Sequence, residues 1–178
     1  IRQAMKEAAV LAEDVSFMNT HGTATVYNDE MESKAIHLAG LETVPVHSLK
    51  SYFGHTLGAS GVIESIICIH ELKENVLFGT LGYEKPGVSM PILVQADHQE
   101  IPMKHCIKTA SGFGGCNAAI VLTLPAYQKQ PSRVQSSVTV HTTATVSIEN
   151  SCLSMNGETV FSSSAPNFAQ FIREAYKN

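Results

Sequence analysis

Apolar positions along the chain follow two spacings, which predict alternating strands and helices. Short apolar runs at 15–18 (VSFM) and 44–48 (VPVHS) are typical of buried strands. Apolar residues at helical spacing predict helices over 2–13, over 29–40 and over about 58–74. The alternation of strands and helices is the pattern of an α/β sheet covered by helices.

The second predicted helix carries signals for both of its ends. Asp29 is expected to be the N-cap, because Glu32 follows three residues later in a capping-box pattern. Gly40 is expected to end the helix in the left-handed conformation. The face that we expect to be buried carries Met31, Ala35, Ile36 and Leu38.

The later part of the chain predicts less regular structure. Residues 79–91 are rich in glycine and proline and predict a loop, and 92–94 (ILV) predict a short strand. Two strand-like stretches flank the glycine turn at 112–116, which indicates a hairpin. We therefore expect 1–124 to form one structural unit.

Composition changes after Pro125. Residues 125–178 are interpreted as a polar linker followed by an extension whose role the sequence does not indicate. Within the extension, 138–148 alternate as a strand, Asn156-Gly157 predicts a hairpin turn, and 165–176 show a helical stripe.

Bulk composition excludes several classes of function. A formal net charge of −4, without a basic patch, gives no reason to expect nucleic acid. The longest apolar run is interrupted by Glu64 and is too short for the roughly 20 residues that cross a bilayer, so no membrane association is expected. Four cysteines without a CxxC pair favour free thiols in a reducing cytoplasm, and the histidine spacing predicts no metal site.

Two histidines in glycine-bearing loops are the main candidates for chemistry. His21 lies in HGTAT and His55 in KSYFGHTLGASG, and each loop follows a predicted strand, where α/β proteins place reactive groups. Two neutral imidazoles aimed at one point can hold a developing oxyanion. Lys50 adds positive charge, and Glu64 is its available counter-charge. The chain offers no nucleophile in a convincing setting.

Three segments carry a resemblance to a known family. NTHGTATVYNDEMESKAI, KSYFGHTLGASGVIES and SGFGGCNAAIVL resemble, in this order, the C-terminal motifs of the beta-ketoacyl-acyl carrier protein synthases, condensing enzymes of the thiolase superfamily. The resemblance covers about residues 1–124. It implies one half, the C-terminal one, of the five-layer αβαβα thiolase-like fold, with a mixed sheet covered by helices.

The resemblance also implies a reaction and residue roles. The reaction is a decarboxylative Claisen condensation of an acyl thioester with malonyl-acyl carrier protein, in fatty acid or polyketide biosynthesis. It needs no cofactor other than the phosphopantetheine of the carrier protein, which would be the partner of a homodimeric cytoplasmic enzyme. By motif position, His21, His55 and Lys50 would be catalytic and Glu64 would support Lys50. Substrate-binding residues would be Thr23, Thr25 and the gating Phe113.

Departures from the family leave other interpretations open. The family's nucleophilic cysteine would precede Ile1, so we expect a fragment that is inactive alone, and Cys116 is not a convincing replacement. The alternative is a non-catalytic partner subunit of the chain-length type. The retained histidines and Lys50 favour the synthase. A degradative thiolase is a third option, but HGTAT and GFGG favour the synthase over it.

Overall fold

The computed structural model describes residues 1–128, 146–149, 152–155 and 158–162. The chain divides into two compact units, Ile1–Lys129 and Gln130–Asn178. The first unit contains every candidate site residue.

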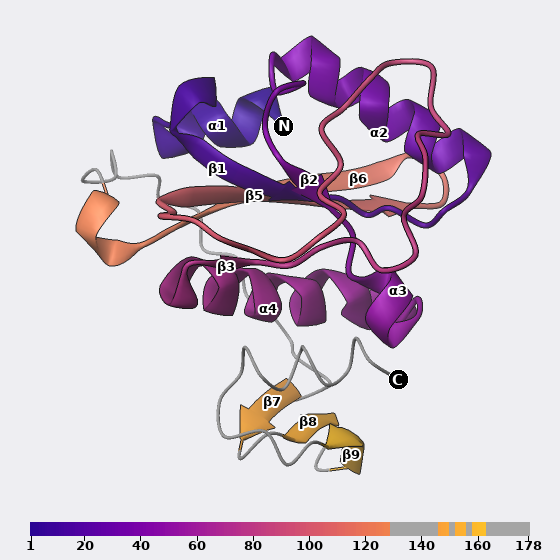
Figure 1. Cartoon of the computed structure of the whole chain (residues 1–178), viewed down its shortest axis with the longest axis vertical. Helices are drawn as coiled ribbons and strands as arrows, with labels where there is room; N and C mark the ends of the chain where they lie inside the picture. Colours follow the sequence, from indigo (N-terminus) through magenta and orange to yellow (C-terminus); the bar gives the residue numbers. More distant parts are fainter. Residues whose placement is uncertain (129–145, 150–151, 156–157, 163–178) are drawn as a thin grey trace. The chain divides into compact units, whose positions relative to one another are not determined.

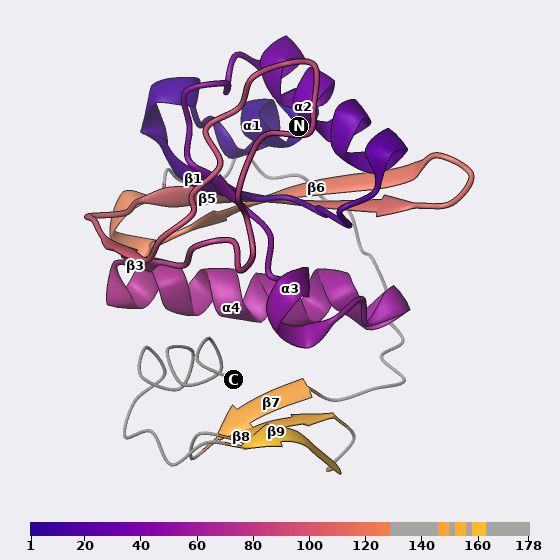
Figure 2. The same cartoon turned by 45° about the vertical axis from the view of Figure 1, so that its right-hand side comes forward.

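A four-stranded mixed sheet forms the centre of the first unit (Figure 1), in the strand order β2-β1-β5-β6. β1 (Val15–Asn19) pairs in parallel with β2 (Val46–His47) on one side and with β5 (His105–Gly112) on the other. β5 returns as the antiparallel β6 (Cys116–Thr123), which confirms the predicted hairpin. This hairpin extends beyond the covering helices (Figure 2).

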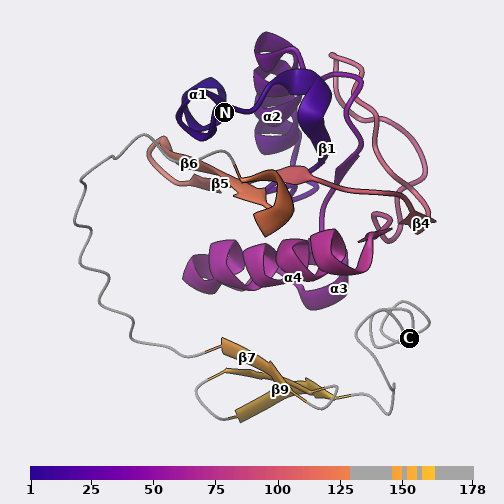
Figure 3. The same ribbon diagram turned by 90° about the vertical axis from the view of Figure 1, so that its left-hand side faces the viewer.

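Helices cover both faces of the sheet (Figure 3). α1 (Arg2–Ala8) and α2 (Val26–Ala39) lie on one face, and α3 (Lys50–Phe53) and α4 (Ser60–Glu74) on the other. Successive residues of a strand point to opposite faces. Met18 accordingly packs in the core on the side of α1 and α2, whereas Phe17 packs with Cys68 and Leu72 of α4.

Several predicted boundaries are wrong. The first helix ends at Ala8, because Ala9 adopts the left-handed conformation (φ 52°), and a short 3-10 turn, η1 (Ala12–Asp14), follows. The second helix begins at Val26 with Thr25 as N-cap and no capping side chain, so Asp29 lies within the first turn. Its end at Gly40 (φ 73°) is confirmed. Of the four residues expected on its buried face, Ile36 is buried, Ala35 is intermediate, and Met31 and Leu38 are exposed.

The remaining elements follow the prediction in type more than in length. The predicted strand at 44–48 is reduced to β2, and 92–94 contribute an isolated bridge from Val94 to Val46. The helix predicted from about 58 is confirmed, with the 3-10 turn η2 (Leu57–Ala59) leading into α4. Elements that the sequence did not predict are the antiparallel pair β3 (Val76–Leu77) and β4 (Gln99–Glu100) and the 3-10 turn η3 (Pro125–Tyr127).

In the second unit the described residues form a three-stranded antiparallel sheet. Its strands are β7 (Val146–Glu149), β8 (Cys152–Met155) and β9 (Glu158–Ser162). Of the strand predicted over 138–148, residues 146–148 lie among the described residues, where they form part of β7. The predicted turn at 156–157 and helix at 165–176 lie outside the described residues.

A buried polar cluster joins β2 to α4 beneath the sheet. The His47 imidazole and the Glu71 carboxylate are fully buried, with Nε2 3.4 Å from Oε2. Burial alone would lower the pKa of His47, but the Glu71 charge and the contact with Cys68 outweigh it and raise the pKa to about 9. At neutral pH the cluster is therefore a buried imidazolium–carboxylate pair.

This pair makes stability pH-dependent. Because the folded-state pKa of His47 lies above its ordinary value of 6.5, the stabilisation is complete below pH 6.5 and is lost as the pH rises through about 9. We predict that Glu71→Gln lowers the free energy of unfolding by about 3 kcal/mol at pH 6 and by much less at pH 9.5. Denaturant unfolding at the two pH values measures this difference.

Glu74→Gln is the matched control, since Glu74 lies on the same helix three residues later and is exposed. It should change the free energy of unfolding little at either pH. An equal loss of stability at pH 6 and pH 9.5 in Glu71→Gln would show that the charge pair is not the cause.

Candidate functional site

Parallel pairing of β1 and β2 brings the two histidine loops together. Asn19 lies opposite His47 in the register, so the loops that follow both strands leave the same edge of the sheet. Ser48 Oγ donates a hydrogen bond to the carbonyl of Gly22 over 2.8 Å. A Cβ on Gly22, whose φ is +45°, would lie only 2.6 Å from the Ser48 Cβ. Glycine is thus required at position 22 both by the close approach and by the backbone conformation.

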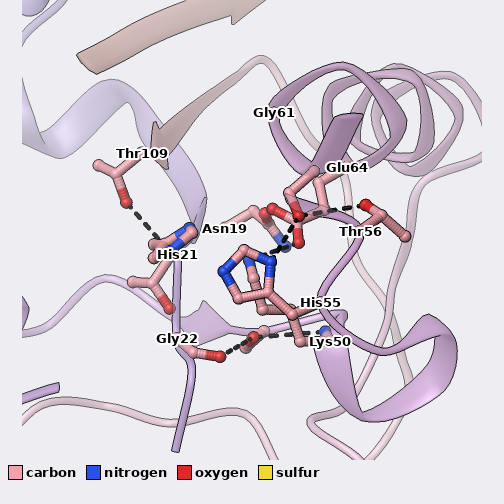
Figure 4. A network of polar contacts seen from close by, with 12 residues as sticks. Asn19, His21, Gly22, Lys50, His55, Thr56, Gly61, Glu64 and Thr109 are labelled. Carbon is pink, nitrogen blue, oxygen red and sulfur yellow. Dashed lines mark hydrogen bonds and ion pairs between the residues drawn. The ribbon is translucent and has the colours of Figure 1, made fainter. Parts of the chain in front are cut away.

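The structure brings His21 and His55 face to edge (Figure 4). Their ring centroids are 5.0 Å apart and the ring planes make an angle of 81°. His21 is buried, at 6% exposure, whereas His55 is exposed. Two residues separated by 34 positions in the sequence thus form one pair, as predicted.

Hydrogen bonds fix the proton position on His55. The backbone N–H of Leu57 donates to Nδ1 over 3.0 Å, and the Ser60 hydroxyl lies 3.2 Å from the same atom. Since Nδ1 accepts a hydrogen bond, the neutral ring carries its proton on Nε2. Leu57 has a φ of 50°, so the loop adopts a conformation unusual for leucine at the residue that makes this contact.

A buried carboxylate holds the backbone of the His21 loop. Glu32 accepts hydrogen bonds from the N–H groups of His21 (2.9 Å) and Gly22 (2.8 Å) and from the Thr109 hydroxyl (2.7 Å). The spacing of Glu32 from Asp29 predicted a capping box. In the structure, the hydrogen bonds of Glu32 instead connect α2 with the His21 loop and with β5.

The environment of His21 favours its neutral form. Burial is the main cause that lowers its pKa, and the positive charge of Lys50 adds to the effect. The Glu32 carboxylate opposes them, while Lys108 and His55 lower the pKa further. Nδ1 of His21 is buried without a hydrogen-bond partner among the described residues.

Lys50 pairs with Glu64, as predicted. The Lys50 Nζ lies 2.6 Å from Oε1 of Glu64, and both side chains are more than nine-tenths buried. Burial lowers the pKa of Lys50, and the contact with Glu64 partly offsets this. Lys108, which no sequence pattern indicated as a site residue, lies 2.6 Å from the other oxygen, Oε2. Lys50 acts on His21 by charge, whereas the contacts that orient His55 come from Leu57 and Ser60.

A cavity of about 610 Å³ opens beside His55, and His21 is not among the residues that line it. Its lining includes His55 and Lys50, together with Thr23 and Thr25, whose hydroxyls lie 2.8 Å apart. The glycine- and proline-rich residues at 80–88 form much of another wall. Phe113 is fully exposed in the turn of the β5–β6 hairpin and does not line this cavity.

The loop that forms this cavity wall is hydrogen-bonded to α2 through Ser89 and Glu30. Glu30 accepts hydrogen bonds from the backbone N–H of Ser89, over 2.8 Å, and from its hydroxyl, and it forms an ion pair with Lys34. These contacts, that with Lys34 first, lower the pKa of Glu30 to about 2. The carboxylate therefore stays charged and holds the loop in place at neutral pH.

One group of possible metal ligands lies among the described residues. Donor atoms of His47, Cys68 and Glu71 are within 4.8 Å of one another. The pKa of His47 is raised to about 9, and burial raises that of Cys68 well above its ordinary value. Protons would therefore compete strongly with a metal at this cluster.

Within the described part of the chain, no helix combines the length and apolarity needed to cross a membrane.

Comparison with known proteins identifies the family. Residues 1–84 match the beta-ketoacyl synthase C-terminal domain. The putative polyketide beta-ketoacyl synthase 1 of Streptomyces cyaneus is 34% identical over 131 residues, which are 71% of this chain and 31% of the relative. The 3-oxoacyl-acyl-carrier-protein synthase 2 of Vibrio harveyi is 34% identical over 123 residues, 66% of this chain and 30% of the relative.

A solved structure agrees with the sequence matches. It is that of a type II polyketide acyl-carrier protein in complex with its ketosynthase bound to the hexaketide, with a TM-score of 0.62 and 30% identity. The match covers 68% of this chain and 31% of the other. The chain thus spans about a third of the length of the relatives it matches. The chain belongs to the beta-ketoacyl synthases and carries the C-terminal half of their thiolase-like fold.

Proposed function

We propose that this chain supplies the carbanion-forming half of a 3-oxoacyl-acyl carrier protein synthase. The observation that carries the proposal is the His21–His55 pair, whose ring centroids are 5.0 Å apart and whose His55 ring lines the cavity. Two neutral imidazoles in this arrangement can donate hydrogen bonds to one thioester oxygen. Such donors stabilise the negative charge that develops there.

In the proposed reaction, the bond between the malonyl methylene carbon and its carboxyl carbon breaks and carbon dioxide leaves. The electron pair of that bond moves onto the thioester carbonyl oxygen, which becomes an enolate oxygen held by the two imidazoles. The enolate carbon then attacks an acyl thioester on the family's cysteine, forming a carbon–carbon bond and releasing the cysteine thiolate. That cysteine would belong to a preceding part of a longer protein.

The protonation states of the chain's own residues suit this role. His55 has Nδ1 occupied by the Leu57 N–H, so its neutral ring offers Nε2–H as a donor. The lowered pKa of His21 favours a neutral imidazole near pH 7. Lys50 supplies positive charge beside His21; burial lowers the pKa of Lys50, and the contact with Glu64 partly offsets this by stabilising the ammonium form.

The proposed partner is an acyl carrier protein, and the proposed location is the cytoplasm. Thr23 and Thr25 line the cavity and present hydroxyls to the phosphopantetheine arm of an acyl carrier protein. Phe113 would gate the acyl pocket from the exposed turn of the β5–β6 hairpin, outside the lining of this cavity. The matched ketosynthase bound to its carrier protein supports this partner. No other cofactor is required. The proposed full-length enzyme is a homodimer in the cytoplasm, where free thiols such as Cys68 and Cys106 persist.

The alternative function is a non-catalytic partner subunit of the chain-length type. Such a subunit would not need two paired imidazoles with a fixed proton position on one of them. The arrangement of His21, His55, Lys50 and Glu64 therefore favours the catalytic role. We infer that residues 1–178 alone do not condense acyl chains.

The first test removes one oxyanion donor. In the full-length protein that contains this chain, His55→Ala should lower the rate of malonyl-acyl carrier protein decarboxylation by about 10²- to 10³-fold, because one of two hydrogen bonds to the enolate is lost. Release of carbon dioxide from labelled malonyl substrate measures the rate. His70→Ala, on α4 and outside the cavity lining, is the control and should keep the rate. An undiminished rate in His55→Ala would overturn the proposal.

The second test addresses the carrier arm. Thr23→Ala and Thr25→Ala should each raise the KM for malonyl-acyl carrier protein by about 2- to 10-fold with little change in kcat, since each removes one hydrogen bond that the bound arm makes. Steady-state kinetics with increasing carrier concentration measure both constants. The exposed Thr43, before β2, provides the control Thr43→Ala. A fall in kcat at unchanged KM would place these hydroxyls outside arm binding.

A further inference from the structure

Lys108 is a buried cation that the proposed reaction does not use. It lies on β5, opposite Asn19 of β1, and is 2% exposed. Its Nζ donates a hydrogen bond to the carbonyl of Thr109 and lies 2.6 Å from Oε2 of Glu64. Lysine is rarely this deeply buried, because removing an ammonium group from water is costly unless it is paired.

Glu64 lies between two ammonium groups. Oε1 accepts a hydrogen bond from Lys50 Nζ, and Oε2 forms an ion pair with Lys108 Nζ, both at 2.6 Å. The carboxylate thereby connects α3, which carries Lys50, with α4 and the central strand β5. Lys50, Glu64 and Lys108 together carry one net positive charge when all three are ionised.

We propose that Lys108 is a positioning residue of the site, which holds Glu64 from the side of β5 and through it fixes Lys50 beside the histidine pair. Without Lys108, one Glu64 oxygen would be buried without a charged partner. The carboxylate would then be free to rotate and carry the Lys50 ammonium with it. This inference rests on the proposed function of the pair.

The proposal has an electrostatic consequence for His21. The charged and titratable groups that act on His21 are Lys50 from α3, Lys108 from β5, Glu32 from α2, and His55 from the neighbouring loop. Loss of Lys108 removes one positive charge directly and leaves Lys50 and Glu64 as a neutral pair. His21 would then bind a proton more readily and lose its ability to remain a neutral donor at mildly acidic pH.

The test compares Lys108→Met with Lys108→Arg in the full-length protein. We expect Lys108→Met to move the acidic limb of the decarboxylation rate–pH profile upward by about 0.5 to 1 in pH, with unchanged KM for the malonyl carrier. Lys108→Arg keeps the charge and should restore the wild-type profile. Lys104→Met removes a neighbouring exposed charge and should leave the profile unchanged. If methionine prevents folding, Lys108→Gln keeps polar contacts but not charge and should shift the profile in the same way.

A second readout does not depend on activity. The titration of the His21 imidazole, followed by NMR of histidine-labelled protein, should move upward in Lys108→Met by the same amount as the rate profile. An unchanged His21 titration, with a loss of unfolding free energy alone, would overturn the positioning role and leave Lys108 a structural residue. Absence of decarboxylation in the wild type would refute the proposed function, while the NMR titration would still decide the inference about Lys108.

Discussion

The parallel pairing of β1 with β2 is the constraint on which the site depends. It sets Asn19 opposite His47 and so releases two loops from the same edge of the sheet. The loops then touch at Gly22 and Ser48, where a side chain at position 22 would collide at 2.6 Å. Because the backbone itself fixes this approach, the two imidazoles meet without needing a direct bond between them.

Two buried carboxylates, Glu32 and Glu64, stabilise the site in different ways. Glu32 accepts hydrogen bonds from the N–H groups of His21 and Gly22 and so holds the backbone of this loop. Glu64 instead forms ion pairs with the ammonium groups of Lys50 and Lys108. Glu32 therefore fixes the backbone of the His21 loop, and Glu64 fixes the positions of the two ammonium groups. Burial lowers the pKa of His21, and the positive charges of Lys50 and Lys108 lower it further against the opposing charge of Glu32, which keeps the ring suited to hydrogen-bond donation.

The sequence predicted the parts of the site that local patterns encode. His21 and His55 stood in loops after apolar strands, and the Lys50–Glu64 pair followed from opposite charges near one helix start. Lys108 was missed because a lysine within a strand gives no sign of its burial until β5 is known to be central. The role of Glu32 was missed because its spacing from Asp29 also fits a helix cap, and local spacing does not reveal a contact across to β5.

The central claim is that both imidazoles act on one oxygen atom. A crystal structure of the full-length protein with a stable malonyl-thioester analogue tests it most directly. The account predicts that the carbonyl oxygen of the analogue lies about 3 Å from a ring nitrogen of His21 and from Nε2 of His55. A bound analogue whose carbonyl oxygen reaches only one ring, or neither, would contradict the account.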